Sequence, residues 1–87
     1  MAEKKITLIV GKEEFEFNVT TEDFNLYINE MKLDSKVAPA KNMLRRTLVN
    51  QEQKSRINEL CERGLTINLA SLLLDDFQGD IEIEVKK

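Results

Sequence analysis

Few side chains of this 87-residue sequence are suited to catalysis or metal binding. There is no histidine, which removes the commonest general base and the commonest transition-metal ligand. The single cysteine, Cys61, lies four residues after Ile57 on the inner stripe of a predicted helix, and no histidine is available to activate it. We interpret it as a small buried hydrophobe. The sequence therefore predicts a protein that is not an enzyme and that holds no metal and no cofactor.

Charge is unevenly distributed along the chain. Residues 1–35 carry four Lys/Arg and eight Asp/Glu, residues 36–63 carry seven and three, and residues 64–87 carry two and five. Such a division is typical of solvated faces that attract one another within a fold. The basic middle segment, residues 36–63, is still the one electrostatic feature that could bind an external ligand.

One alternative function follows from that basic middle: a small nucleic-acid-binding regulator. Residues 40–63 could form a helix-turn-helix. The side chains presented to DNA would be Gln51, Gln53, Lys54 and Arg56. Three glutamates in the second of these helices, the absence of glycine at the turn and the net charge of −3 argue against nucleic-acid binding.

The elements that would position these groups begin with a β-hairpin. Apolar residues alternate with smaller or polar ones on both sides of Gly11-Lys12, which forms the turn. Because side chains alternate between the faces of a strand, one face of the hairpin is predicted to be core. Its residues are Ile6, Leu8, Val10, Phe15, Phe17 and Val19.

A first helix is predicted from about residue 22 to residue 33, capped by Thr20 or Thr21. Its apolar stripe, facing the sheet, consists of Phe24, Tyr27, Ile28 and Met31. Leu26 and Leu33 fall almost opposite this stripe. Either other helices of the same domain cover these two leucines, or they face a partner.

Three further helices are predicted. The second spans residues 40–49 after Pro39, the third spans residues 51–63 with Asn50 as its cap, and the fourth runs from residue 66 or 68 to about 77. The inner stripe of the second is Ala40, Met43, Leu44, Thr47 and Leu48, and its far side is basic. The fourth is apolar over more than half its circumference, so it is either the most buried helix or partly covered by another molecule.

The chain ends with Ile81, Ile83 and Val85 alternating with charged residues, which predicts a strand paired with the exposed edge of the hairpin. We therefore expect a single α+β domain over residues 1–87, in the order ββααααβ. Its three-stranded antiparallel sheet, built from the N-terminal hairpin and the C-terminal strand, would be covered on one face by about four helices. No segment is long and apolar enough to cross a membrane, and one cysteine suits a reducing, cytoplasmic compartment.

Three stretches resemble a known family. They are EFEFNVTTEDFNLYINEM at residues 14–31, KVAPAKNML at residues 36–44 and the closing IEIEVKK. Together they resemble the small tail assembly chaperones encoded by tailed bacteriophages and prophages. The similarity covers most of the chain, and YINEM followed shortly by KVAPA is its most distinctive part.

The resemblance implies a non-enzymatic protein made in the cytoplasm of the infected bacterium and absent from the mature virion. Such chaperones bind the long tape-measure protein, keep its apolar helical segments from aggregating and help recruit tail-tube subunits. In many phages a ribosomal frameshift near the end of the short reading frame also gives an extended product.

On this basis we expect an amphipathic tape-measure helix to lie in a groove between the first, second and fourth helices. The predicted contact residues are Leu26, Leu33, Val37, Lys41, Arg45 and Arg46. The first three would supply apolar contacts together with part of residues 69–77, and the basic three would steer acidic segments. The sequence leaves open whether the protein also forms a homo-oligomer.

Overall fold

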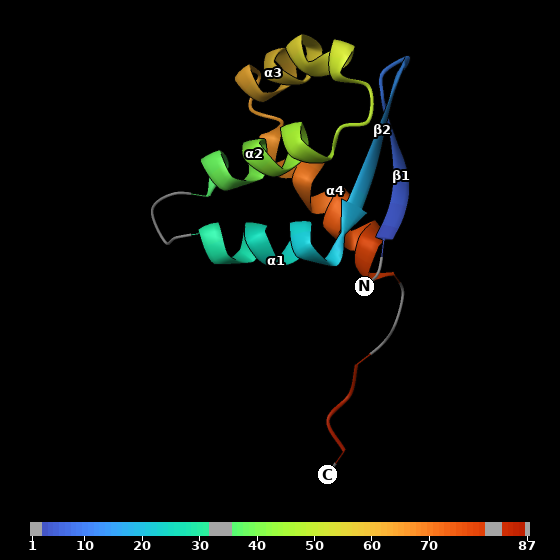
Figure 1. The fold of residues 1–87 in the computed structure, drawn as a ribbon, viewed down its shortest axis with the longest axis vertical. Helices are drawn as coiled ribbons and strands as arrows, with labels where there is room; N and C mark the ends of the chain where they lie inside the picture. Colours follow the sequence, from blue (N-terminus) through green and yellow to red (C-terminus); the bar gives the residue numbers. More distant parts are fainter. Residues whose placement is uncertain (1–2, 32–35, 80–82, 87) are drawn as a thin grey trace.

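The computed structural model describes residues 3–31, 36–79 and 83–86. Its elements are β1 (Glu3–Val10), β2 (Glu13–Thr20), α1 (Thr21–Glu30), α2 (Val37–Thr47), the short 3-10 helix η1 (Gln51–Gln53), α3 (Lys54–Glu62) and α4 (Thr66–Gln78). Figure 1 shows the hairpin along one side of the molecule and the helices against it. The predicted α+β class, the hairpin and the four helices are confirmed.

The hairpin has the register that its alternation predicts. Ile6 lies opposite Phe17 and Leu8 opposite Phe15 in an antiparallel pair. Gly11 adopts a φ of 65° at the turn, a conformation that costs glycine little. Phe15, Phe17 and Val19 are completely buried or nearly so, whereas Ile9 on the other face is 70% exposed. The sheet therefore has one core face and one solvated face.

A short segment after α2 pairs with the outer edge of β2. Leu48 forms an isolated antiparallel bridge with Phe17, and the amide of Val49 donates to the carbonyl of Glu16 at 2.9 Å. The middle of this edge is thus already occupied.

α1 begins where the cap was predicted. Thr20 Oγ1 accepts a hydrogen bond from the amide of Asp23, and Asp23 Oδ2 accepts one from the amide of Thr20, both at 3.1 Å. This reciprocal pair satisfies two amides that have no partner inside the helix. The helix ends at Glu30, before residue 33, where the prediction placed its end.

α2 begins three residues earlier than predicted. Proline was expected to keep Ala38 out of the helix, but Pro39 lies in the first turn, where amides have no intrahelical acceptor and the missing N–H costs nothing. The first bond of the helix runs from the amide of Ala40 to the carbonyl of Lys36 at 3.4 Å. The predicted inner residues Ala40, Met43, Leu44, Thr47 and Leu48 are all buried.

The third predicted helix divides in two. Its first turn is η1, where Asn50 Oδ1 accepts from the amide of Glu52, and α3 follows. The side chain of Gln53 donates to the carbonyl of Glu14 at 3.0 Å. Gly64 closes α3 with a φ of 86°, as expected for a C-terminal glycine.

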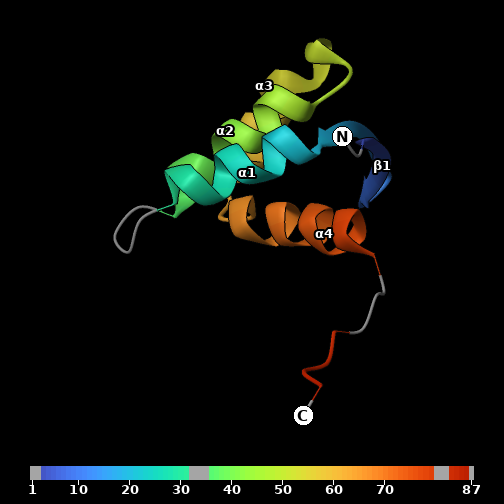
Figure 2. The same cartoon turned by 60° about the horizontal axis from the view of Figure 1, so that its bottom comes forward.

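α4 packs against α2 and against β1. Figure 2 shows α4 running beneath α1 and α2, with its C-terminal end near β1. Leu69, Ala70 and Leu73 are buried in the core, and Gly79 ends the helix with a φ of 77°. One core unites the sheet and all four helices. It consists of Ile6, Phe15, Phe17, Val19, Tyr27, Ala40, Met43, Leu44, Leu48, Ile57, Leu60, Leu69, Ala70 and Leu73.

The predicted C-terminal strand is not confirmed. Ile81 lies outside the described residues, and residues 83–86 have no strand partner among the residues that the structure describes. Ile83 and Val85 are 90% and 82% exposed. The sheet of the described residues has two strands, so the order ββααααβ stays a prediction.

Candidate partner-binding surface

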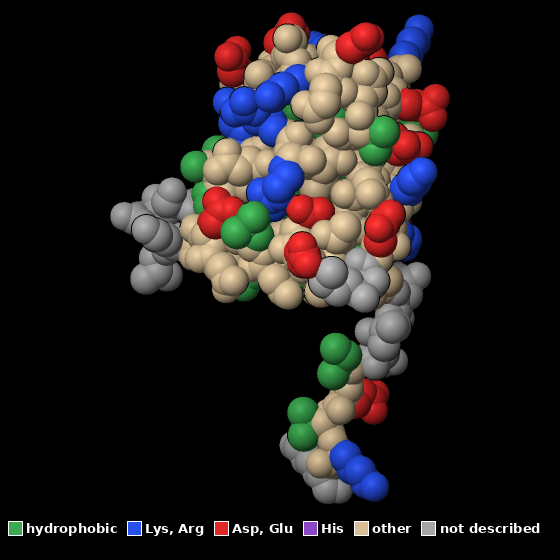
Figure 3. All heavy atoms as spheres, in the orientation of Figure 1, with side chains coloured by type: hydrophobic (Ala, Val, Ile, Leu, Met, Phe, Trp, Pro, Cys, Tyr) green, Lys and Arg blue, Asp and Glu red, His purple; other side chains and the backbone are tan. Residues whose placement is uncertain are grey.

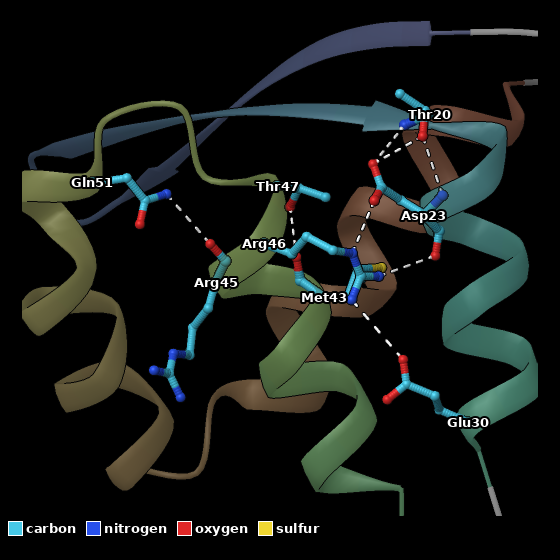
Figure 4. A network of polar contacts seen from close by, with 8 residues as sticks. All are labelled: Thr20, Asp23, Glu30, Met43, Arg45, Arg46, Thr47 and Gln51. Carbon is cyan, nitrogen blue, oxygen red and sulfur yellow. Dashed lines mark hydrogen bonds and ion pairs between the residues drawn. The ribbon is translucent and has the colours of Figure 1, made fainter.

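An arginine on α2, Arg46, links α2 to α1. Arg46 Nε donates to Asp23 Oδ1 at 2.9 Å, one of its terminal nitrogens donates to the carbonyl of Asp23 at 3.3 Å, and the other lies 4.0 Å from Glu30 Oε1. Figure 4 shows the guanidinium lying between the two helices. Arg46 was predicted to face solvent and steer a client. In the structure its charge is satisfied within the chain.

The environment of Asp23 favours its charged form. Burial alone would raise the pKa of this carboxyl, but hydrogen bonds from Arg46 and from the amide and hydroxyl of Thr20, with the charge of Arg46, outweigh burial and lower the pKa. Asp23 therefore stays ionised while it caps α1 and binds α2.

The other predicted residues of α2 lie on a different side of the helix. Val37, Lys41 and Arg45 follow one another at intervals of four residues and form a single line, and Val37 is about half a turn around the helix from Arg46. Val37 is 55% exposed, and Lys41 and Arg45 are half-buried with no ion pair to any residue that the structure describes. Arg45 points away from α1 in Figure 4, and Figure 3 shows basic side chains gathered where α2 meets α3.

α1 exposes apolar side chains in two directions. Leu26 is 43% exposed and Ile28 is 48% exposed, while Tyr27 is the only fully buried residue of the helix. The sequence left open whether other helices of the domain cover Leu26 or whether it faces a partner. In the structure the other helices cover Leu26 only partly. Leu33 lies outside the described residues. Ile28 was predicted to face the sheet, but about half of its side chain is exposed to solvent.

α1 and α4 meet through the stacked rings of Phe24 and Phe77, whose centroids lie 6.0 Å apart. Ile28 lies one turn after Phe24 on α1 and is 48% exposed. Helical spacing predicted the apolar stripe but not which of its members would stay exposed.

α4 adds an apolar surface of its own. Ile67 and Leu72 are 40% and 56% exposed, and with Asn68 and Ser71 they line a shallow hollow of about 390 Å³. The expectation that α4 is partly uncovered is consistent with these values. A second hollow, of about 360 Å³, lies on the solvated face of the sheet and is lined by Thr7, Glu14, Glu16, Val49, Asn50 and Gln53.

The side chains proposed for DNA contact are mostly engaged inside the chain. Gln51 donates to the carbonyl of Leu48 at 2.7 Å, and Gln53 donates to that of Glu14. Arg56 binds Glu13 at 2.7 Å and Glu59 at 2.9 Å, and these hydrogen bonds raise the pKa of the guanidinium further. Three of the four groups thus have internal partners, which does not favour the nucleic-acid alternative.

The described residues contain no obvious chemical centre. Among them no three Cys, Asp or Glu side chains are grouped as metal ligands would be, and Cys61 is only half-buried. No helix in the same ranges has the length and apolar character needed to cross a bilayer. What the surface offers is exposed apolar area on α1, α2 and α4 beside unpaired basic side chains.

Comparison with known proteins identifies the family. The sequence profile of a family described as phage tail assembly chaperone matches residues 6–87, nearly the whole chain. No match was found among curated proteins or among solved structures. A match over this length includes most of the hairpin, all four helices and the C-terminal residues. The chain belongs to the phage tail assembly chaperone family.

Proposed function

We propose that this chaperone binds an amphipathic segment of the tape-measure protein along α1 and across the N-terminal end of α2. The observation that carries the proposal is the exposure of Leu26 and Ile28 on a ten-residue helix whose only fully buried residue is Tyr27. An apolar helical segment of a client that packs against either side of α1 would remove the exposed side chain on that side from water. Leu33 and Val37 follow Leu26 in the chain and would extend the same contact.

Lys41 and Arg45 on α2 would supply the charged part of the proposed client contact. Lys41 and Arg45 carry charges without internal ion partners in the described ranges, so they are available to attract acidic residues of a client. Charges at the rim of an interface act mainly on the association rate. Arg46 contributes indirectly, because it holds α1 against α2. We assign it a positioning role.

The wider role follows from the family. The protein would act without catalysis in the cytoplasm of the infected bacterium, keep the tape-measure protein soluble, help recruit tail-tube subunits and be absent from the mature virion. It would do so as one folding unit spanning residues 1–87. The match to tail assembly chaperones supports this proposal.

Co-expression with the tape-measure protein of the same phage, followed by co-purification, tests the proposal. We expect Leu26→Asp combined with Ile28→Asp to abolish co-purification while the circular dichroism spectrum is unchanged. Ile9→Asp is the matched control, because Ile9 is 70% exposed but lies on the solvated face of the sheet. Retained binding by the double variant, or equal loss in the control, would contradict the proposed surface.

If the double variant fails to fold, Lys41→Glu with Arg45→Glu tests the part of the proposed contact on α2 without touching apolar side chains. A shift of duplex DNA at physiological salt would instead favour the regulator. Self-association on a sizing column in the absence of any client would favour a structural oligomer.

A further inference from the structure

The outer edge of β1 is the open side of the sheet. β2 is partly covered on its far side by Leu48 and Val49. In residues 3–31, 36–79 and 83–86, no backbone hydrogen bond reaches β1 from the side away from β2. Such an edge presents unpaired N–H and C=O groups to which another strand can bind.

An uncovered apolar side chain lies beside this edge. Lys4 on β1 contacts the C-terminal part of α4: its Nζ lies 2.7 Å from the carbonyl oxygen of Asp76 and 3.2 Å from Asp76 Oδ2. Leu72 precedes Asp76 by one helical turn and shares its side of the helix. Leu72 is 56% exposed, whereas its neighbours Leu69 and Leu73 are 5% and 0% exposed.

The chain carries a segment that matches this edge. Ile83 and Val85 are 90% and 82% exposed and alternate with Glu84 and Lys86. This is the pattern of a strand with one apolar and one solvated face. Figure 1 shows α4 ending near the N-terminal end of β1, with the last residues following it.

We propose that residues 83–86 bind the outer edge of β1 as a third strand that covers Leu72. In this arrangement Ile83 and Val85 share the core face with Ile6 and Leu8. Glu84 then lies on the solvated face, where Lys5 is exposed and opposite in charge.

The connection is long enough for the segment to reach this edge. α4 ends near Lys4, and the four residues from Gly79 to Ile83 span at most about 14 Å. An antiparallel strand with Ile83 opposite Leu8 begins four residues along β1 from Lys4, roughly 13 Å away. The antiparallel third strand predicted from the sequence is therefore within reach. The short connection also gives the segment a high effective concentration at the edge.

Urea unfolding of the full chain tests the coupling that this contact requires. We expect Leu72→Ala to lower the urea midpoint in the otherwise unchanged chain and to leave it nearly unchanged when Ile83→Asp and Val85→Asp are also present. Ile28→Ala is the matched control, because Ile28 is 48% exposed but lies on α1. It should shift the midpoint equally in both backgrounds. Equal shifts for Leu72→Ala in both backgrounds would overturn the proposal.

Hydrogen exchange gives a second readout that does not depend on side-chain truncation. Amides of β1 that point away from β2 should exchange slowly in the unchanged chain and rapidly in the Ile83→Asp, Val85→Asp variant. Rapid exchange in both would overturn the proposal. Protection that increases with protein concentration would also overturn it, since the strand would then come from a second copy. None of these outcomes depends on binding of a tape-measure client.

Discussion

Arg46 on α2 binds Asp23 on α1 through an Nε to Oδ1 hydrogen bond of 2.9 Å, while the second carboxylate oxygen of Asp23 caps its own helix at Thr20. One acidic side chain thus starts α1 and attaches it to α2. The helix that we propose to meet the client is held in place by this contact.

Removing the arginine should loosen that attachment. We expect Arg46→Gln to lower the free energy of unfolding by about 1 kcal/mol, because a charge-assisted hydrogen bond to a partly buried carboxylate is lost while some solvent screening remains. Urea unfolding measures the effect. Arg45→Gln is the control, since no ion pair of Arg45 is found in the described ranges, and it should change stability by less than about 0.5 kcal/mol. Equal losses for both arginines would contradict the assignment.

Acid should weaken the same contact. The pKa of Asp23 in the folded protein lies below its ordinary value of 3.8, so the ionised carboxylate contributes stability above about pH 4, and this contribution is lost as the pH falls through the folded pKa. Urea unfolding between pH 6 and pH 2 should show a smaller acid-dependent loss in Asp23→Asn than in the unchanged protein. Identical pH profiles would show that Asp23 is not linked to stability.

Association with the client should depend on the basic line of α2. We expect Lys41→Glu with Arg45→Glu to slow association with the tape-measure protein about tenfold or more at low salt, and to change dissociation less. Stopped-flow measurements at increasing ionic strength would check this. The rate of the unchanged protein should fall with salt, and that of the variant should not. A faster variant would mean that the client is basic at this position.

The core should be sensitive at α2. Leu44 is 0% exposed, and we expect Leu44→Ala to destabilise the protein by about 2–5 kcal/mol through lost burial and a cavity. Ile9→Ala, at a site that is 70% exposed, should cost less than about 1 kcal/mol. A small effect at Leu44 would mean that the core around α2 collapses to fill the space.

The regular elements could be predicted because each has a local cause. The hairpin follows from period-two alternation around Gly11, and the start of α1 follows from the cap at Thr20. The start of α2 was misplaced because the proline rule was applied to Ala38, although Pro39 lies in a first turn that needs no amide from it. Periodicity did not reveal that the third helix divides at Gln53, nor that the side chain of Gln53 contacts Glu14, 39 residues away.

The candidate surface was predictable only in part. Helical spacing placed Leu26 off the core stripe, and its exposure agrees with this position. Spacing could not show that Phe24 would stack on Phe77, that Ile28 would stay exposed, or that Arg46 would bind Asp23. Periodicity gives the direction in which a side chain points along its own helix. The neighbour that it meets is decided by tertiary packing.

The pairing of Leu48 and Val49 with β2 has a consequence for self-association. A β-hairpin with two unpaired edges can bind strands of other molecules on both sides and so grow into an insoluble fibre. Here the bond from Val49 to Glu16 obstructs one margin at its centre, so stacking of hairpins can proceed in one direction at most. If the protein binds apolar segments as we propose, this obstructed edge would limit its aggregation while several copies gather on one client.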